Sequence, residues 1–212
     1  MSPRLPLSPS LRLPLFSFLL LLCLLAAPAA RALSVIPPTF AELVAESESI
    51  VRGEVTAIRS AYDDASPGRP IRTYVTFRVA RTLKGPAPAG DSVTLVFLGG
   101  TVGPDSLSVP GMPTFTVGDR EIVFVARNGK TYCPLIAAGH GRYRILRDAA
   151  TQRDYVAREN RTPLEDPADV VLPLTAADIV TRLKSPSRAL SPGDFEARIT
   201  RAVADPATPA QP

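Results

Sequence analysis

The sequence predicts a mainly β domain, a single small barrel or sandwich framed by short helices. Several segments alternate apolar and polar residues, as half-buried strands do. Turns rich in glycine and proline separate these segments at close spacing, which is typical of all-β architectures. Helical signals flank this stretch at its two ends. We therefore expect one apolar core with a sheet at its centre.

The N-terminal segment, residues 1–32, has the pattern of a removable export signal. Arg4 and Arg12 give it a positively charged start, and an apolar run follows at 13–27. An Ala-Arg-Ala cleavage pattern then occupies 30–32. We expect cleavage near Ala32, a secreted or periplasmic protein, and no integral membrane segment in the mature chain.

The mature chain is expected to be nearly neutral and free of disulfides. The leader holds three of the 24 basic residues and none of the 20 acidic ones, so little net charge remains. This balance excludes an extended nucleic-acid footprint. Cys23 lies in the leader, which leaves Cys133 as the single mature thiol. An apolar core must therefore stabilise the fold without cross-links.

A short helix is predicted at the start of the mature domain. Thr39 and Glu42 have the spacing of a capping box. Phe40, Leu43 and Val44 then share one face of a helix that ends near residue 47.

Strands are predicted downstream of this helix. The first is expected at 51–57 and the second, with the most regular alternation, at 73–79. The third, at 92–98, is apolar on both faces and is expected to be central. The expected core residues are Val51, Val55, Val75, Phe77, Val79, Leu95, Phe97, Ile122 and Phe124.

Two hairpins are predicted after a long loop at 99–118. Asn128-Gly129 indicates a type I′ turn that joins a fourth strand at 121–127 to a fifth at 130–136. A further hairpin pairs 142–146 with 155–158.

The C-terminal part is predicted to return to helix. Thr175 resembles a cap for a helix at 176–184, and Ser191 with Pro192 opens another. Phe195, Ile199 and Val203 form one stripe of that last helix. We thus expect four regions, which are a signal peptide at 1–32, a β domain at 33–160, a C-terminal extension at 161–204 and a disordered tail at 205–212.

An ordered set of segments resembles a family of uncharacterised secreted bacterial domains. The segments are 43–44, 49–55, 82–85, 99–100, 109–113, 115–120 and 139–143. The resemblance covers roughly residues 40–147. It implies a small OB-like β-barrel, similar to tissue metalloprotease inhibitors and netrin modules, and it implies a fold far more than a function.

One departure from those inhibitors limits what the resemblance implies. They block a zinc enzyme with an N-terminal cysteine, whereas the mature chain is expected to begin with Leu33 and Ser34. A protease partner would therefore be bound through another surface.

The reactive side chains form no recognisable catalytic or metal-binding motif. His140 is the single histidine and lies between two glycines, and Cys133 lies in an expected strand. We interpret them as a turn histidine and a small core residue, with a nucleophile–base pair as the alternative. Asp63 and Asp64 lack the ligand count that calcium needs. No catalytic residue, metal site or cofactor is predicted.

The polar face of the second strand is the first candidate binding surface. Arg72, Tyr74 and Arg78 lie on this face together with Thr76. OB-like barrels often bind ligands on a strand face, and a tyrosine flanked by arginines suits a sugar or a peptide. A solvated outer face is the alternative interpretation.

The loop at 99–118 is the second candidate. It is unusually long and carries Leu107, Val109 and Met112 between prolines. It is expected to be either an interaction surface or a lid packed on the barrel.

These features favour a non-enzymatic binding module for an extracellular protein, such as a protease, or for another ligand. A hydrolase or hydrolase accessory protein of the cell envelope is one alternative, and a purely structural envelope component is another.

Overall fold

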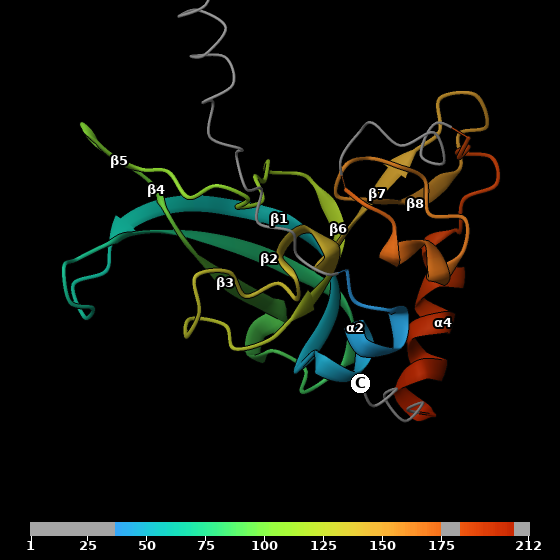
Figure 1. Ribbon diagram of the computed structural model, residues 1–212, viewed down its shortest axis with the longest axis horizontal. Coiled ribbons are helices and arrows are strands. Elements are labelled where there is room, and N and C mark those ends of the chain that lie inside the picture. The colour runs from blue at the N-terminus through green and yellow to red at the C-terminus, as the bar shows by residue number, and fades with distance from the viewer. Residues whose placement is uncertain (1–36, 175–182, 206–212) are drawn as a thin grey trace, which may run out of the picture. The chain divides into compact units, whose positions relative to one another are not determined.

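A six-stranded antiparallel sheet is the framework of the residues that the structure, a computed structural model, describes: 37–174 and 183–205 (Figure 1). In pairing order its strands are β3 (Ser92–Leu98), β2 (Ile71–Lys84), β1 (Ser49–Tyr62), β6 (Arg120–Val125), β7 (Arg142–Arg147) and β8 (Asp154–Arg158). A separate two-stranded sheet pairs β4 (Gly100–Val102) with β5 (Asp105–Leu107). The predicted mainly β fold is confirmed. The described strands do not close into a barrel, because β3 and β8 end the sheet on opposite sides.

The short helices lie around this sheet. They are α2 (Phe40–Glu46), α4 (Pro192–Ala204) and the 3-10 turns η2 (Ala89–Asp91), η3 (Ala138–Gly141) and η4 (Pro167–Val171). No helix among the described residues is long and apolar enough to cross a membrane.

The predicted fifth strand at 130–136 is wrong. Pro134 has no N–H to donate, and a single bridge between Val125 and Leu135 is all the pairing that this segment makes.

Asn128 and Gly129 do form a turn, closed by a 2.9 Å bond from the N–H of Lys130 to the carbonyl of Arg127. It is not the predicted type I′ hairpin turn, because that type needs a positive φ at both central residues and only Gly129 has one, not Asn128. The Asn128 side chain accepts from the N–H of Val96 at 3.0 Å and donates to the carbonyl of Thr94 at 2.8 Å.

β3 ends the sheet, so the prediction that this strand is central is wrong. Its apolar character on both faces does not reflect a central position, because the segment after β6 covers its outer edge. Besides the two bonds of Asn128, the carbonyl of Tyr132 accepts from the N–H of Leu98 at 2.8 Å. An uncovered edge of this kind invites pairing with other chains, and the loop prevents it here.

The sheet buries residues on both of its faces, because β6 lies between two apolar clusters. Ile122 and Phe124 point to the cluster covered by α2 and α4, whereas Val123 and Val125 point to the other. The second cluster also contains Val51, Val55, Val75, Phe77, Leu95, Leu135 and Phe97. Every expected core residue is buried except Val79, which is half-buried.

The caps of the two α-helices are confirmed. Thr39 Oγ1 accepts from the N–H of Glu42 at 3.2 Å, and Glu42 accepts in return from the N–H of Thr39 at 2.7 Å. Ser191 Oγ accepts from the N–H of Asp194 at 3.1 Å at the start of α4. The helix predicted at 176–184 and the tail at 205–212 lie largely outside the described residues.

Helix α4 belongs to the same core as the sheet. The ring of Phe195 lies 4.9 Å from that of Tyr143 and 6.3 Å from that of Phe124, centroid to centroid. Leu164 and Val170, from the expected C-terminal extension, are also fully buried in this cluster. The extension thus completes the core that the sheet begins.

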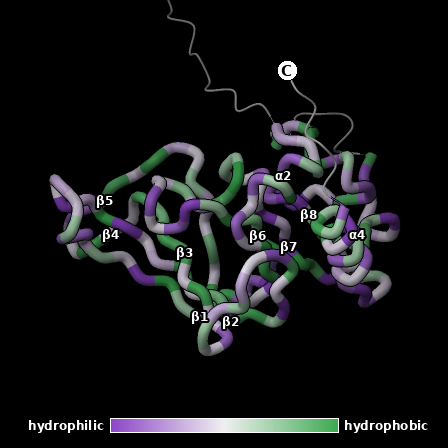
Figure 2. The backbone as a smooth tube through the Cα atoms, turned by 90° about the horizontal axis from the view of Figure 1, so that it is seen from below, coloured by the Kyte–Doolittle hydropathy of each residue, from purple (hydrophilic) through white to green (hydrophobic). Residues whose placement is uncertain are grey.

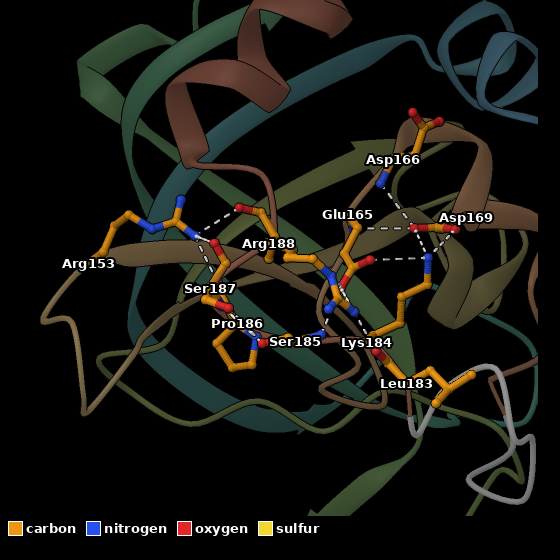
Figure 3. Close-up of polar contacts among 11 residues, drawn as sticks. Arg153, Glu165, Asp166, Asp169, Leu183, Lys184, Ser185, Pro186, Ser187 and Arg188 are labelled. Carbon is orange, nitrogen blue, oxygen red and sulfur yellow. Dashed lines mark hydrogen bonds and ion pairs between the residues drawn. The ribbon is translucent and has the colours of Figure 1, made fainter.

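A polar network ties residues 183–190 to η4 and to the segment before it (Figure 3). Lys184 Nζ lies 2.9 Å from Asp169 Oδ1, and Arg188 pairs with Glu165 at 3.0 Å. Arg153 donates to three backbone carbonyls, those of Pro186, Ser187 and Ala189. These contacts fix the chain just before α4, which indicates a structural role for this network.

Candidate functional site

A pocket of about 370 Å³ opens where the β1–β2 hairpin meets β6, β7, β8 and the start of α4. Its lining residues are Arg52, Gly53, Glu54, Arg78, Val79, Ala80, Arg120, Ile145, Asp154 and Pro192. The volume lies in the range of small-ligand sites. Apolar side chains and charged ones both contribute to the lining, so the pocket offers an apolar surface beside fixed charges.

The guanidinium groups of the pocket are held by carboxylates. Arg78 lies 2.7 Å from Glu54. Arg120 forms a fork with both carboxylate oxygens of Asp154, at 2.7 and 3.1 Å. The hydrogen bond from Arg120 is the main reason why the pKa of Asp154 is lowered, and Asp154 in turn raises the pKa of Arg120. Both groups therefore stay charged across the ordinary pH range.

Arg52 is anchored from the side of α4. It lies 2.7 Å from one oxygen of Glu196, and Arg81 lies 2.7 Å from the other. Glu196 is almost fully buried, with 2% of its side chain exposed. This bridge joins β1, β2 and α4 at the edge of the pocket.

Gly53 permits the close approach of β2 to β1 at the pocket. A Cβ on this residue would lie 2.7 Å from the carbonyl oxygen of Arg78, closer than packing allows. The β1–β2 register also shifts between Arg52 and Gly53. Such a bulge re-aims neighbouring side chains, and here Arg52 and Glu54 both line the pocket.

The predicted binding face of β2 is divided by the structure. Arg78 lines the pocket, but Arg72 lies six positions away along the strand, about 20 Å, and pairs with Asp63 at 2.6 Å. Tyr74 lies between them beneath Arg59, whose guanidinium carbon is 4.1 Å from the ring centroid. The pocket thus gathers Arg78 with residues of other strands rather than with Arg72 and Tyr74.

The predicted apolar residues of the 99–118 loop are half-buried. Met112 packs against the second core cluster, and Leu107 pairs with Gly100 in the small sheet. Val109 lies beside Gly99. The packing of Met112 favours the interpretation of this part of the loop as a lid.

Phe115, which the sequence did not single out, holds that lid in place. Its ring meets Phe77 edge to face at 5.9 Å and Phe97 at 5.1 Å. The guanidinium carbon of Arg142 lies 4.0 Å from its centroid.

A buried ionic cluster around Arg142 was also missed. Arg142 and Glu121 are both fully buried and form a two-point contact, with 2.9 Å from Nε to Oε2. Glu159 accepts at 3.0 Å, and the carbonyl of Thr114 accepts at 2.6 Å. Burial raises the pKa of Glu121 and of Glu159, against the lowering effect of Arg142. The sequence carries no signal for this cluster, because its members are far apart along the chain.

His140 and Cys133 occupy separate environments. His140 is buried, and its Nδ1 lies 3.2 Å from the carbonyl of Val170. Burial lowers its pKa, so the ring is neutral at pH 7. Cys133 packs on the second cluster, and burial raises its pKa to about 11, which keeps the thiol protonated. Within the described chain no hydrogen bond joins these two side chains.

The acidic residues of the β1–β2 turn are used internally. Asp63 accepts from Arg72 and Ser66, and Asp64 pairs with Arg69. Across residues 37–174 and 183–205, no group of three or more histidine, cysteine or acidic side chains is arranged to hold a metal ion.

No protein-family model matches the sequence, and a search of curated proteins finds no match.

Proposed function

We propose that this protein is a secreted or periplasmic binding module with no catalytic role of its own, and that its ligand enters the pocket beside Arg78. The pocket carries this proposal. It combines a volume of about 370 Å³ with Arg52 and Arg120, which are held in place by ion pairs to Glu196 and Asp154. A site that is ordered before binding loses little entropy when it is occupied.

The pocket suits a ligand with an apolar body and an acceptor group. Arginine has five N–H donors, and the contacts to Glu54 and Asp154 use only some of those on Arg78 and Arg120. The remaining donors can reach a carboxylate or a hydroxyl on the ligand. Val79, Ile145 and Pro192 supply apolar surface for the rest. A side chain or terminus of an extracellular protein, such as a protease, has this chemistry.

The bonds between the segment after β6 and β3 support the OB-like barrel as a proposal. These bonds join the chain that follows β6 to β3, the strand at the opposite end of the β3-β2-β1-β6 part of the sheet. That approach of two edges is what a small barrel requires. The resemblance to secreted bacterial domains is proposed on the same ground.

Export is the first part of the proposal to test. The charged start, the apolar run at 13–27 and the cleavage pattern at 30–32 favour removal of the leader. N-terminal sequencing of the protein from its source should begin at or near Leu33. A full-length chain retained in the membrane would contradict the proposed localisation.

Binding at the pocket can be tested by capture from the native extracellular fraction. An Arg78→Ala, Arg120→Ala double variant should lose at least about tenfold of the captured partner, because central arginines often dominate an interface. Arg69→Ala is the matched control, since this arginine is exposed and far along the hairpin. Equal capture by the double variant would rule out the pocket.

The hydrolase alternative has its own readout. It rests on the Cys133 and His140 pair, and the raised pKa of the thiol argues against it. If Cys133→Ala with His140→Ala abolished a hydrolytic activity while the fold persisted, the enzyme alternative would replace the binding module. A structural envelope component would show neither partner capture nor activity.

A further inference from the structure

The outer half of β1 has a strand partner on one side only. β2 pairs with β1 along nearly its whole length, whereas β6 pairs with it only as far as Glu54. On the side that faces β6, the last backbone hydrogen bonds of β1 join Val55 to Gly118 and Asp119, at 2.8 and 2.9 Å. Among the described residues, 56–61 make no backbone hydrogen bond on this side. We call residues 56–61 the open edge.

The open edge is already extended, and its first four residues are exposed whereas Ser60 and Ala61 are half-buried. Thr56, Ala57, Ile58 and Arg59 are all exposed to solvent. Pairing with β2 keeps this segment straight, and Figure 1 shows the two strands running away from the helices toward β4 and β5. In Figure 2 the end of the molecule at β4 and β5 carries several hydrophilic stretches. A partner strand would therefore meet a template that needs no further ordering.

The open edge also carries a positive charge without a carboxylate partner. Arg59 forms no ion pair with any described acidic residue, and its only aromatic contact is the ring of Tyr74. The three carboxylates of the same hairpin, Glu54, Asp63 and Asp64, are each paired with another arginine. Opposite residues on paired strands have Cβ atoms about 5 Å apart, where opposite charges attract. An acidic residue on the added strand would fit opposite Arg59.

Apolar surface lies next to this charge. Ile58 is 37% exposed. Val117 is 59% exposed and precedes Gly118, whose N–H makes the last bond to β1 on this side. Successive residues of a strand point to opposite faces, so Ile58 and Arg59 present an apolar and a basic face. The matching segment alternates apolar and acidic residues.

We propose that the open edge of β1 binds an extended segment of a partner protein as an added strand, and that this segment alternates apolar and acidic residues. Main-chain hydrogen bonds supply the affinity, and Arg59 supplies the selectivity for acidic sequences. A second copy of this chain is a poorer occupant, because it would bring another unpaired Arg59 to the same short ladder. The surface is separate from the pocket, so the two proposals stand or fall independently.

Synthetic peptides test the ladder directly. The probes are a short peptide alternating valine and glutamate, its valine–lysine counterpart, and two versions of the acidic peptide N-methylated at alternate residues in either phase. Amide hydrogen exchange, read by NMR on the purified protein, should slow at 56–61 with the acidic peptide. One of the two N-methylated versions must fail to cause this, since it lacks the donors that face β1. The proposal is overturned if protection at 56–61 survives both methylation patterns. It is overturned equally if the unmodified acidic peptide gives no protection at 56–61 at concentrations near 1 mM, where even a weak complex forms.

Charge reversal tests the selectivity. The unmodified protein should prefer the acidic peptide to the basic one by about threefold, the range of one cross-strand ion pair. Arg59→Glu should invert this preference, Arg59→Gln should abolish it, and the control Arg69→Glu should leave it unchanged. An unaltered preference in Arg59→Gln would refute the proposed partner. Protection at 56–61 that appears without peptide and grows with protein concentration would also refute it, in favour of self-association.

Discussion

Arg142 has no exposed surface, and its surroundings explain how a buried guanidinium is tolerated. Glu121, Glu159 and the carbonyl of Thr114 accept its N–H groups, and the ring of Phe115 covers one face. Burying a guanidinium without partners costs free energy, whereas a buried guanidinium whose N–H groups are hydrogen-bonded can be retained. The charge of Arg142 is therefore compensated locally, and Glu121 depends on it in the same way.

Replacing Arg142 should be strongly destabilising. Arg142→Met leaves the carboxylate of Glu121 buried without its cation, which typically costs about 3–5 kcal/mol. Arg78→Met is the matched control, because that pair with Glu54 is exposed and should cost at most about 1 kcal/mol. Urea unfolding of both variants at neutral pH gives the comparison. Equal losses would show that burial does not set the value of the Arg142 pair.

The same variant carries a pH dependence. The pKa of Glu121 is already raised by burial, and it should rise further when Arg142 is gone. A carboxyl with a raised pKa in the folded state binds more protons when folded than when unfolded, so stability falls as the pH rises through that range. The deficit of Arg142→Met should therefore shrink as the pH is lowered toward the ordinary glutamate value of 4.5.

At the scale of single elements, the local pattern of apolar and polar residues predicted most of the long strands. β1, β2 and β3 contain the expected segments, and β3 has the predicted bounds, whereas β6 ends at Val125, two residues before the predicted end. The outer part of β1, residues 58–62, was missed because it extends beyond the core, where burial no longer imposes a pattern. β4 and β5 were missed because they are only three residues long.

The candidate site could be predicted only in part for a related reason. Arg78 stood out on the polar face of β2. Glu54, Arg120 and Asp154 meet it through the pairing of β1 with β6 and the hairpin of β7 with β8. That register depends on tertiary packing, which a local pattern does not contain. The position of β3 was mispredicted likewise. It ends the sheet, and the turn at Asn128 leads into a loop that covers this edge rather than into a fifth strand.

Two variants of β2 test which face of this strand is buried in the core. Phe77 is fully buried and packs on Phe115, so Phe77→Ala should cost about 3–5 kcal/mol. Tyr74→Ala removes a half-buried ring from the other face and should cost about 1 kcal/mol, much of it the contact with Arg59. Thermal and urea unfolding measure both. A larger loss for Tyr74 would mean that the strand faces the other way.

At the scale of the whole molecule, the chain closes its core with its last described helix. The sheet leaves Ile50, Phe124 and Tyr143 uncovered on one face, and α4 covers them with Phe195 and Ile199. With no intramolecular disulfide among the described residues, this apolar contact and the Glu196 bridge hold α4 in place. The fold is therefore expected to form only when the C-terminal segment is present.

Truncation at two positions tests this dependence. A chain that ends after Leu190 loses Phe195, Glu196 and Ile199. Deleting a buried phenylalanine or isoleucine side chain costs about 2–5 kcal/mol each. That sum is comparable to the total stability of a domain, about 5–15 kcal/mol. We expect the shortened chain to lose its cooperative urea transition, whereas a chain ending after Asp205 keeps every contact described for α4 and should unfold as the intact protein does. Phe195→Ala, which removes one ring and leaves the Glu196 bridge, should fall between the two. If the chain ending at Leu190 unfolded cooperatively at an unchanged midpoint, α4 would be a dispensable appendage and the sheet a complete domain without it.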